Sequence, residues 1–348
     1  MAVSLALEKY INGITLVPST KTDFRSFFSV RVRDLASYGQ QRYAGIHCVD
    51  GAFGIEKLGL TEQFTDKAAD YHRKYSGVPH FKELLKCATN GLAIPENAVI
   101  LDLGSGSGNT VIAALDLFPS CSVIAIDLSE ELLRILQHYA RTKPEYDNRL
   151  FLMCQDACLD TFRHESVDLV LGGAILHHLI DPSMAILAAL RALKPGGFAI
   201  FFEPFENGAS VLRLAIQEIL QANENQAQRL EPAVKNFLKA VDYDYEVRTG
   251  TDKSAPIYKK IDDKWLFTRR YFENCAAAAG ASDLKIHTIN ELENQFSCMI
   301  KTLLRVGLER EDDALPKWAW NVLSRYDCAF SRNLREDLFL EACIHIRK

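Results

Sequence analysis

The sequence predicts an α/β fold in which a mostly parallel β-sheet is covered by helices. Between residues 98 and 205, short β-branched runs alternate with helical stretches, a pattern typical of parallel strands joined by crossover helices. The runs are nearly continuously apolar, as expected for strands buried on both faces. The helices carry clear end signals, because Ser129 precedes one helix, Pro182 opens the next, and a Lys-Pro-Gly-Gly run ends it.

Seven strands are expected, five in this alternating segment and two nearer the C-terminus. They are predicted at residues 98–104, 122–128, 150–157, 167–173, 197–205, about 285–289 and 338–347. Two stretches interrupt the alternation with helical patterns of their own, at residues 207–264 and at about 291–333. We interpret both stretches as insertions into the sheet domain.

Composition and charge limit the kinds of partner. The 348 residues carry a formal net charge of -5, with both signs interspersed, so no basic field is expected for a nucleic acid or an anionic membrane surface. We therefore expect a small-molecule partner, no nucleic acid and no membrane, and a homodimer remains open. The nine cysteines form no C-x-x-C pair and no zinc-type spacing with histidine, so no metal is expected. Scattered thiols and an N-terminus without a signal-like leader favour a cytoplasmic protein.

The stretch "VILDLGSGSGNT", residues 99–110, combines a strand, a glycine-rich turn and a helix start. This combination lets a backbone approach a ligand closely and points amides toward it. A dinucleotide fingerprint would need a third glycine in sixth place, where Asn109 stands, and a phosphate-binding loop would need Gly-Lys-Ser/Thr. The observed pattern is instead an acidic residue followed by glycine at alternate positions.

This pattern resembles motif I of class I S-adenosylmethionine-dependent methyltransferases. Three further segments agree with that family in order: "AIDLS" ends the second strand, "CQDAC" ends the third, and "LHHL" and "LKPGG" flank the following helix. The resemblance implies a Rossmann-like, seven-stranded class I methyltransferase sheet whose last strand is antiparallel. It also implies S-adenosyl-L-methionine as cofactor and methyl transfer as the activity.

The resemblance assigns cofactor-binding roles residue by residue. Asp127 would accept the ribose hydroxyls, Asp156 and Ala157 would bind the adenine, and Asp102 would place a carboxylate near the cationic ligand. The complete set of predicted cofactor residues is Asp102, Gly104, Ser105, Gly106, Gly108, Asp127, Leu128, Asp156, Ala157 and Gly172. Asp127 also has a purely structural interpretation, because it could help to cap the following helix together with Ser129.

Candidate catalytic residues follow the fourth and fifth strands, at the carboxyl edge where open α/β sheets bind ligands. His177 and His178 lie in "LHHL", and the "AILH" segment resembles one in phosphoethanolamine-type methyltransferases that pairs a histidine with an N-terminal tyrosine. Tyr75 is our candidate for that tyrosine, with Tyr71 nearby. Glu203 is a candidate for contacting the acceptor or orienting a histidine, or for receiving backbone amides.

The predicted organisation follows from these assignments. Residues 1–95 form a mostly helical N-terminal cap, with a helix from about 80 to 94, and residues 96–206 form the cofactor-binding core. Residues 207–264 form a lid over the substrate, and residues 265–348 complete the sheet around the insertion at about 291–333. The acceptor is expected to be a small metabolite, methylated on oxygen, carbon or nitrogen. The alternatives are an NAD-dependent oxidoreductase and a non-catalytic binding module that keeps the cofactor fold.

Overall fold

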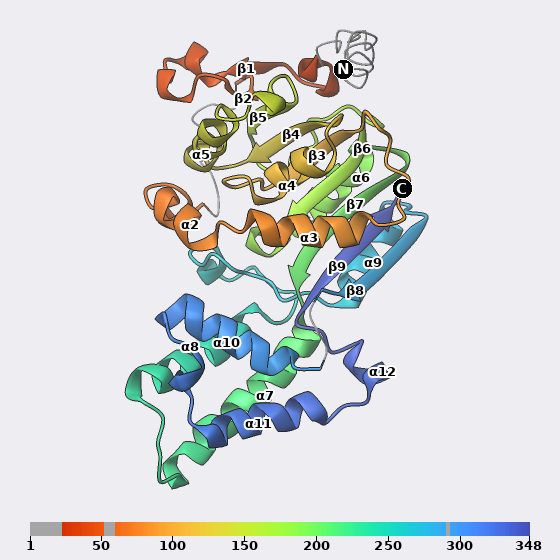
Figure 1. The fold of residues 1–348 in the computed structure, drawn as a ribbon. Helices are drawn as coiled ribbons and strands as arrows, with labels where there is room; N and C mark the ends of the chain where they lie inside the picture. The colour runs from red at the N-terminus through yellow and green to blue at the C-terminus, as the bar shows by residue number, and fades with distance from the viewer. Residues whose placement is uncertain (1–22, 52–59, 290–292) are drawn as a thin grey trace, which may run out of the picture.

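The computed structural model describes residues 23–51, 60–289 and 293–348. Within them, the chain builds one nine-stranded sheet flanked by helices, with a separate layer of helices below it (Figure 1). The strands are β1 (Val32–Asp34), β2 (Ile46–Val49), β3 (Val99–Leu103), β4 (Ser122–Asp127), β5 (Leu150–Cys154), β6 (Val167–Gly173), β7 (Leu193–Pro204), β8 (Asp283–Thr288) and β9 (Glu341–Arg347).

The strand order is β1-β2-β5-β4-β3-β6-β7-β9-β8. All seven predicted strands are present, and β3 to β7 run parallel to one another. β9 is antiparallel to both β7 and β8, which confirms the predicted orientation of the last strand. The predicted strand count was wrong, because β1 and β2 extend the sheet beyond β5. These two strands are only three and four residues long, and β2 buries every second residue, so neither has the continuous apolar pattern of the central strands.

Helices cover both faces of the sheet. One face packs on α3 (Val78–Thr89), α4 (Asn109–Leu117) and α5 (Glu130–Ala140), which contribute Leu85, Val111 and Leu133 to a shared core. The other face packs on α6 (Pro182–Ala192) and α9 (Arg269–Ala278), through residues such as Ile186 and Phe272. Burial on both sides explains why β3 is buried at all five positions.

A helical layer follows β7 directly. It contains α7 (Glu206–Ala222), α8 (Pro232–Arg248), α10 (Gln295–Leu308) and α11 (Lys317–Cys328). These helices share one apolar core, so the two predicted insertions pack together although residues 265–290 separate them in the sequence. Two short helices lie elsewhere: α2 (Ala68–Tyr75) and α12 (Arg332–Arg335). None of the helices in the described ranges is long and apolar enough to cross a membrane.

Candidate active site

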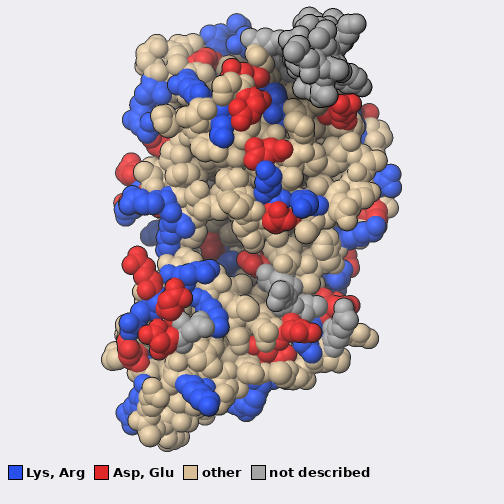
Figure 2. Space-filling model, in the orientation of Figure 1, with Lys and Arg blue, Asp and Glu red and all other residues tan. Residues whose placement is uncertain are grey.

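A cavity of about 950 Å³ lies where the carboxyl ends of the parallel strands face the helical layer. On the face shown in Figure 2, a hollow separates the sheet domain from the helices below it. The cavity is lined by the glycine loop, by the ends of β4 to β7, and by α8 and α10. Predicted site residues that line it are Tyr75, Gly104, Ser105, Gly106, Asp127, Leu128, Asp156, Ala157, His177, His178 and Glu203.

The glycine loop is shaped by two left-handed residues. Gly104 has a φ of +61°, and a Cβ there would lie 2.2 Å from the Ile175 side chain. Gly106 has a φ of +52° and no heavy atom near its open side. The Ser105 hydroxyl is buried between them and has no hydrogen-bond partner among the described residues. A ligand lying against this loop would therefore meet bare backbone, while the Ser105 hydroxyl lies buried just behind it.

Asp127 ties the loop to the next strand end. One carboxylate oxygen accepts from the Gly106 amide at 2.8 Å, and the other accepts from the Ser129 amide at 2.7 Å. The second contact is the structural alternative considered from the sequence. Asp127 also lines the cavity, at the end of β4.

The neighbouring strand end supplies the other half of a nucleoside site. Asp156 follows β5, where one of its oxygens accepts from the Cys158 amide at 2.9 Å, and Ala157 lies beside it. Leu128 and Leu132 add apolar wall to the same part of the cavity. This part of the cavity offers the acidic side chain of Asp156, the backbone at Ala157 and two apolar leucines. Such a combination fits an adenine-bearing ligand such as S-adenosylmethionine.

Asp102 does not line the cavity, contrary to the prediction of a carboxylate near the cationic ligand. It is completely buried beneath the loop, where it accepts a hydrogen bond of 2.8 Å from the Thr110 hydroxyl. Its second oxygen has no partner among the described residues. Burial raises the pKa of Asp102 to about 8, so the group is mostly uncharged at neutral pH. Its contribution here is to hold the start of α4.

The raised pKa of Asp102 predicts a pH dependence of stability. Between its unfolded pKa near 4 and its folded value, the native state binds more protons than the unfolded state, so the free energy of unfolding falls as pH rises. Asp102→Asn removes this group. Urea unfolding measures the free energy of unfolding of both proteins from pH 5 to pH 7. The value for the variant minus the value for the wild type should rise by about 1.4 kcal/mol per pH unit. The exposed Asp160→Asn serves as control, and parallel stability curves for Asp102→Asn and wild type would contradict the prediction.

Gly108 and Gly172, also predicted as cofactor residues, lie outside the cavity wall. Gly108 has a φ of +107° at the start of α4, and a Cβ there would lie 2.5 Å from Leu136. A Cβ on Gly172 would lie 2.5 Å from the Phe201 ring. Both glycines thus allow close packing behind the cavity, rather than contact with its contents.

The carboxylate of Glu203 organises the segment after β6. One oxygen accepts from the backbone amides of Ile175 and Leu176, at 3.0 and 2.7 Å. The other lies 3.3 Å from the His177 amide and 2.6 Å from His177 Nδ1. Glu203 therefore fills two of the three roles considered from the sequence. It accepts hydrogen bonds from backbone amides, and it orients a histidine.

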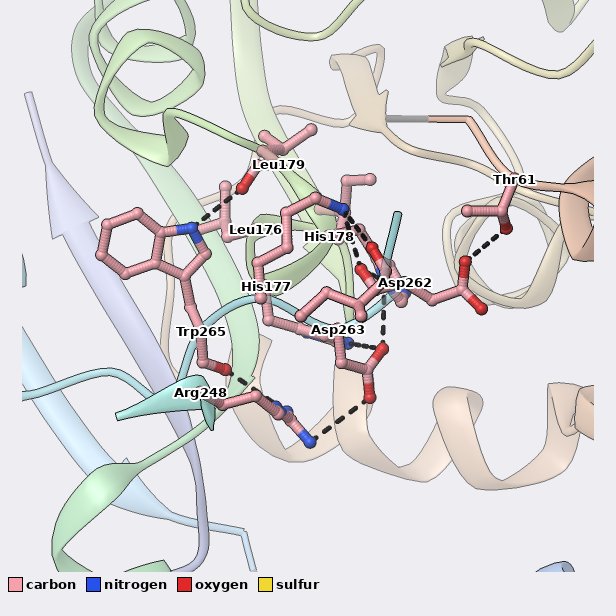
Figure 3. A network of polar contacts seen from close by, with 12 residues as sticks. Thr61, Leu176, His177, His178, Leu179, Arg248, Asp262, Asp263 and Trp265 are labelled. Carbon is pink, nitrogen blue, oxygen red and sulfur yellow. Dashed lines mark hydrogen bonds and ion pairs between the residues drawn. The ribbon is translucent and has the colours of Figure 1, made fainter. Parts of the chain in front are cut away.

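Asp263 connects the two histidines to the helical layer (Figure 3). Its Oδ1 lies 3.6 Å from His177 Nε2 and 3.2 Å from His178 Nδ1, and its Oδ2 lies 3.3 Å from Arg248. Arg248, at the end of α8, is buried and also pairs with Asp244 at 3.1 Å. The cluster thus joins the edge of the sheet to the helix that roofs the cavity.

The two histidines differ in electrostatic environment. Burial and the neighbouring His178 lower the pKa of His177, against the opposing effect of Glu203. Burial also acts to lower the pKa of His178, but the hydrogen bond and charge of Asp263 outweigh it and raise that pKa. For Asp263, burial is outweighed by the hydrogen bond to His178 and by His177 and Arg248, so its pKa lies well below its usual value. The pKa values of the two histidines are therefore shifted in opposite directions.

Tyr75 lies on the cavity wall but at some remove from the histidines. Its ring packs on Tyr71 at 4.8 Å, Tyr71 contacts Phe64 at 5.1 Å, and Phe64 contacts the His178 ring at 5.3 Å. Within the described ranges, neither tyrosine donates a hydrogen bond to either histidine. The tyrosines form an aromatic wall, and the histidine–tyrosine pairing stays a prediction for the ligand-bound protein.

Sequence reasoning did not identify Asp263 or Arg248. Asp263 lies in a polar stretch that was interpreted as a loop within the insertion, and it follows His178 by 85 residues. Arg248 ends a helix whose amphipathic pattern is weak. No local spacing links these residues to "LHHL", although two adjacent aspartates, separated from the apolar "WLF" run by one lysine, were a usable hint.

The methyltransferase domain family matches residues 101–201 of this chain, which covers β3 to most of β7. The tRNA 5-carboxymethoxyuridine methyltransferase of Escherichia coli K12 is 30% identical over 103 residues, or 30% of this chain and 39% of that protein. The ubiquinone biosynthesis O-methyltransferase of Hydrogenovibrio crunogenus is 31% identical over 121 residues, or 35% of this chain and 48% of that protein. The matched region thus spans less than half of either relative.

Among solved structures, the fold is similar to that of Haemonchus contortus phosphoethanolamine N-methyltransferase 2 in complex with S-adenosyl-L-methionine. The TM-score is 0.48 at 14% identity, covering 99% of this chain and 73% of that one. The family match, the sequence relatives and the order of the central strands agree with one another. Residues 101–201 are therefore similar to the methyltransferase domain family and to S-adenosylmethionine-dependent methyltransferases over the central strands of the sheet.

Proposed function

We propose that this protein transfers the methyl group of S-adenosylmethionine to a small-molecule acceptor, on oxygen, carbon or nitrogen. One observation carries the proposal: a single cavity joins the glycine loop and Asp127 to the histidine cluster and then continues between α8 and α10. Donor and acceptor would therefore share one enclosed volume, as an in-line displacement requires.

The cofactor would be held at the sheet edge. The Gly104–Gly106 backbone and Ser105 would surround its amino acid part, Asp127 would accept the ribose hydroxyls, and Asp156 with Ala157 would bind the adenine. The bound cofactor supplies an electrophilic methyl group on a cationic sulfur. The task of the protein is then to place an acceptor atom against that methyl group and to exclude water.

His177 is positioned to bind the acceptor's polar group. Because Glu203 engages Nδ1 at 2.6 Å, the Nδ1 atom carries the proton of the neutral ring and Nε2 is left as a hydrogen-bond acceptor on the cavity side. An acceptor hydroxyl, amine or acidic carbon could donate its proton to this atom. Glu203 would act through His177 as a positioning residue.

The far end of the cavity favours an apolar acceptor body. Phe237 and Val241 from α8 face Met299, Leu303 and Val306 from α10 across this space. Apolar walls with a few polar groups at one end are typical of small-molecule sites. The helical layer, formed by both insertions, would act as the lid.

The experiment that tests the proposal follows a labelled methyl group from S-adenosylmethionine into fractions of a cell extract. We expect label in a small-molecule fraction and not in RNA or protein. Because one sequence relative is a tRNA methyltransferase, the RNA fraction is the critical comparison. Label found in RNA alone would overturn the small-molecule assignment, while keeping the transfer itself.

The role of the apolar end predicts a specific kinetic effect. Leu303→Lys would place a charge among apolar side chains, so the KM for the acceptor should rise at least about tenfold, as expected from losing a buried apolar contact. The Kd of S-adenosylmethionine should change by less than about twofold, because Leu303 does not contact the glycine loop. Leu214→Lys is the matched control, since Leu214 is 56% exposed on α7. Equal effects of both variants on the acceptor would contradict the proposed lid.

A further inference from the structure

Three side chains at the histidine cluster place potential metal ligands together. His177, His178 and Asp263 each offer one ligand atom within 4.8 Å of the others, and all three line the cavity. From this geometry we propose that they form a binding site for a divalent transition-metal ion of the zinc type. The sequence contains no metal-ligand spacing because the carboxylate follows the histidines by 85 residues.

The strongest observation for a metal site concerns the protonation of His177, which leaves a lone pair on Nε2. Glu203 already accepts from backbone amides with both oxygens, so it is the acceptor in its 2.6 Å contact with Nδ1, and the proton is on Nδ1. Nε2 of the neutral ring then carries a lone pair, and it faces the Asp263 carboxylate at 3.6 Å. Two electron-rich atoms that face each other in a partly buried site favour a cation between them.

Two of the three ligands are oriented by a further group, as is usual around bound metals. Glu203 holds His177 through Nδ1, the ring nitrogen that would not bind the ion. The ligand atom of His178 would be Nδ1, which lies 3.1 Å from the Asp262 carbonyl and would have to give up its proton to bind the ion. Arg248 contacts Asp263 through Oδ2, which leaves Oδ1 turned to both histidines. Figure 3 shows Arg248, Asp263 and the two histidines close together.

The separations match the size of the ion. A tetrahedral zinc ion binds nitrogen and oxygen at about 2.0–2.2 Å, which places its ligands about 3.3–3.6 Å apart. Asp263 Oδ1 lies 3.6 Å from His177 Nε2 and 3.2 Å from His178 Nδ1. The two histidine nitrogens lie within 4.8 Å of each other, and binding would displace the proton that His178 shares with Asp263.

Two histidines and one carboxylate leave at least one coordination position open toward the cavity. If the proposed function holds, that position would take an oxygen of the methyl acceptor. The ion would then bind the acceptor directly and His177 would serve as its ligand. The favoured acceptor class is accordingly one with a hydroxyl, carbonyl or carboxylate oxygen.

The test is a titration of chelator-treated protein with Co²⁺, followed by its visible absorption, and with Zn²⁺ by calorimetry. All proteins carry His287→Ala, because His287, Cys343 and His345 form a second group of potential ligands within the described ranges. We expect one ion per chain, and Asp263→Asn should weaken binding at least about a hundredfold. Asp262→Asn is the matched control, since its side chain bonds Thr61 outside the cluster and its carbonyl is unchanged.

Folding of each variant is checked by thermal unfolding and by S-adenosylmethionine titration. Equal metal affinity in the Asp263→Asn and Asp262→Asn proteins, or no bound ion at 100-fold excess, would overturn the site. Methyl transfer that survives chelation, with no metal bound, would overturn the metal site and leave the proposed function standing. A protein that binds the metal but does not bind S-adenosylmethionine would overturn the proposed function and leave the metal site standing.

Discussion

Replacement of Asp127 by alanine is expected to weaken S-adenosylmethionine binding at least about a hundredfold. The change would remove an ionised acceptor for two ribose hydroxyls, and hydrogen bonds to charged groups contribute about 1.5–3 kcal/mol each. It would also free the Gly106 amide, which Asp127 holds at 2.8 Å, so the loop would lose its shape. Since 1.4 kcal/mol corresponds to a tenfold change, two lost contacts give the expected factor.

Calorimetric titration measures this effect directly. Asp127→Asn keeps one carbonyl oxygen and should lose about tenfold, between alanine and the wild type. Asp160→Ala is the charge-matched control, because Asp160 is exposed and pairs with Arg191 at 2.7 Å. An Asp127→Ala protein with the affinity of the wild type would mean that Asp127 only accepts from the Gly106 and Ser129 amides and does not bind the cofactor.

Removal of the Glu203 side chain should destabilise the fold by about 3–5 kcal/mol, the usual loss when one partner of a buried charged network is deleted. The carboxylate has no exposed surface and bonds three successive backbone amides as well as the His177 ring. Glu203→Ala would leave these donors buried without acceptors. Urea unfolding of the Glu203→Ala protein measures the loss.

Glu203→Gln separates the structural role from the positioning role. Glutamine can still accept from Ile175 and Leu176, so the loss of stability should fall to about 1–2 kcal/mol. Its amide group would now donate toward His177 Nδ1, and the ring should change tautomer so that Nε2 carries the proton. Nitrogen NMR of labelled histidine reports this directly. An unchanged His177 tautomer in a folded Glu203→Gln protein would show that Glu203 does not set the state of Nε2.

The sequence predicted the centre of the sheet well for a clear physical reason. β3 to β7 are long apolar runs buried on both faces, and such runs are distinctive in any context. β1 and β2 escaped prediction because they are only three and four residues long, and because β2 pairs with β5, about a hundred residues away. Their strand structure depends on a partner that no local pattern reveals.

The candidate site also divides into residues that local sequence predicts and residues that only the tertiary structure brings together. Gly104, Gly106, Asp127 and Asp156 line one cavity, and their positions could be predicted because the glycine loop and the strand ends are local in sequence, while their binding of a cofactor stays a prediction. Asp102 was singled out from the sequence, but its raised pKa was not predicted, because that pKa depends on burial under the loop. The partners of His177 come from β7, the insertion and α8, and only tertiary structure brings them together.

The central claim is that the cavity binds S-adenosylmethionine in the geometry of a methyltransferase. Calorimetric titration of the full chain with S-adenosylmethionine, S-adenosylhomocysteine and NAD tests it most directly. We expect one site for each of the first two ligands, weakened by Asp127→Ala, and no heat of binding from NAD. Saturable binding of NAD with no signal from either S-adenosyl compound would contradict the account.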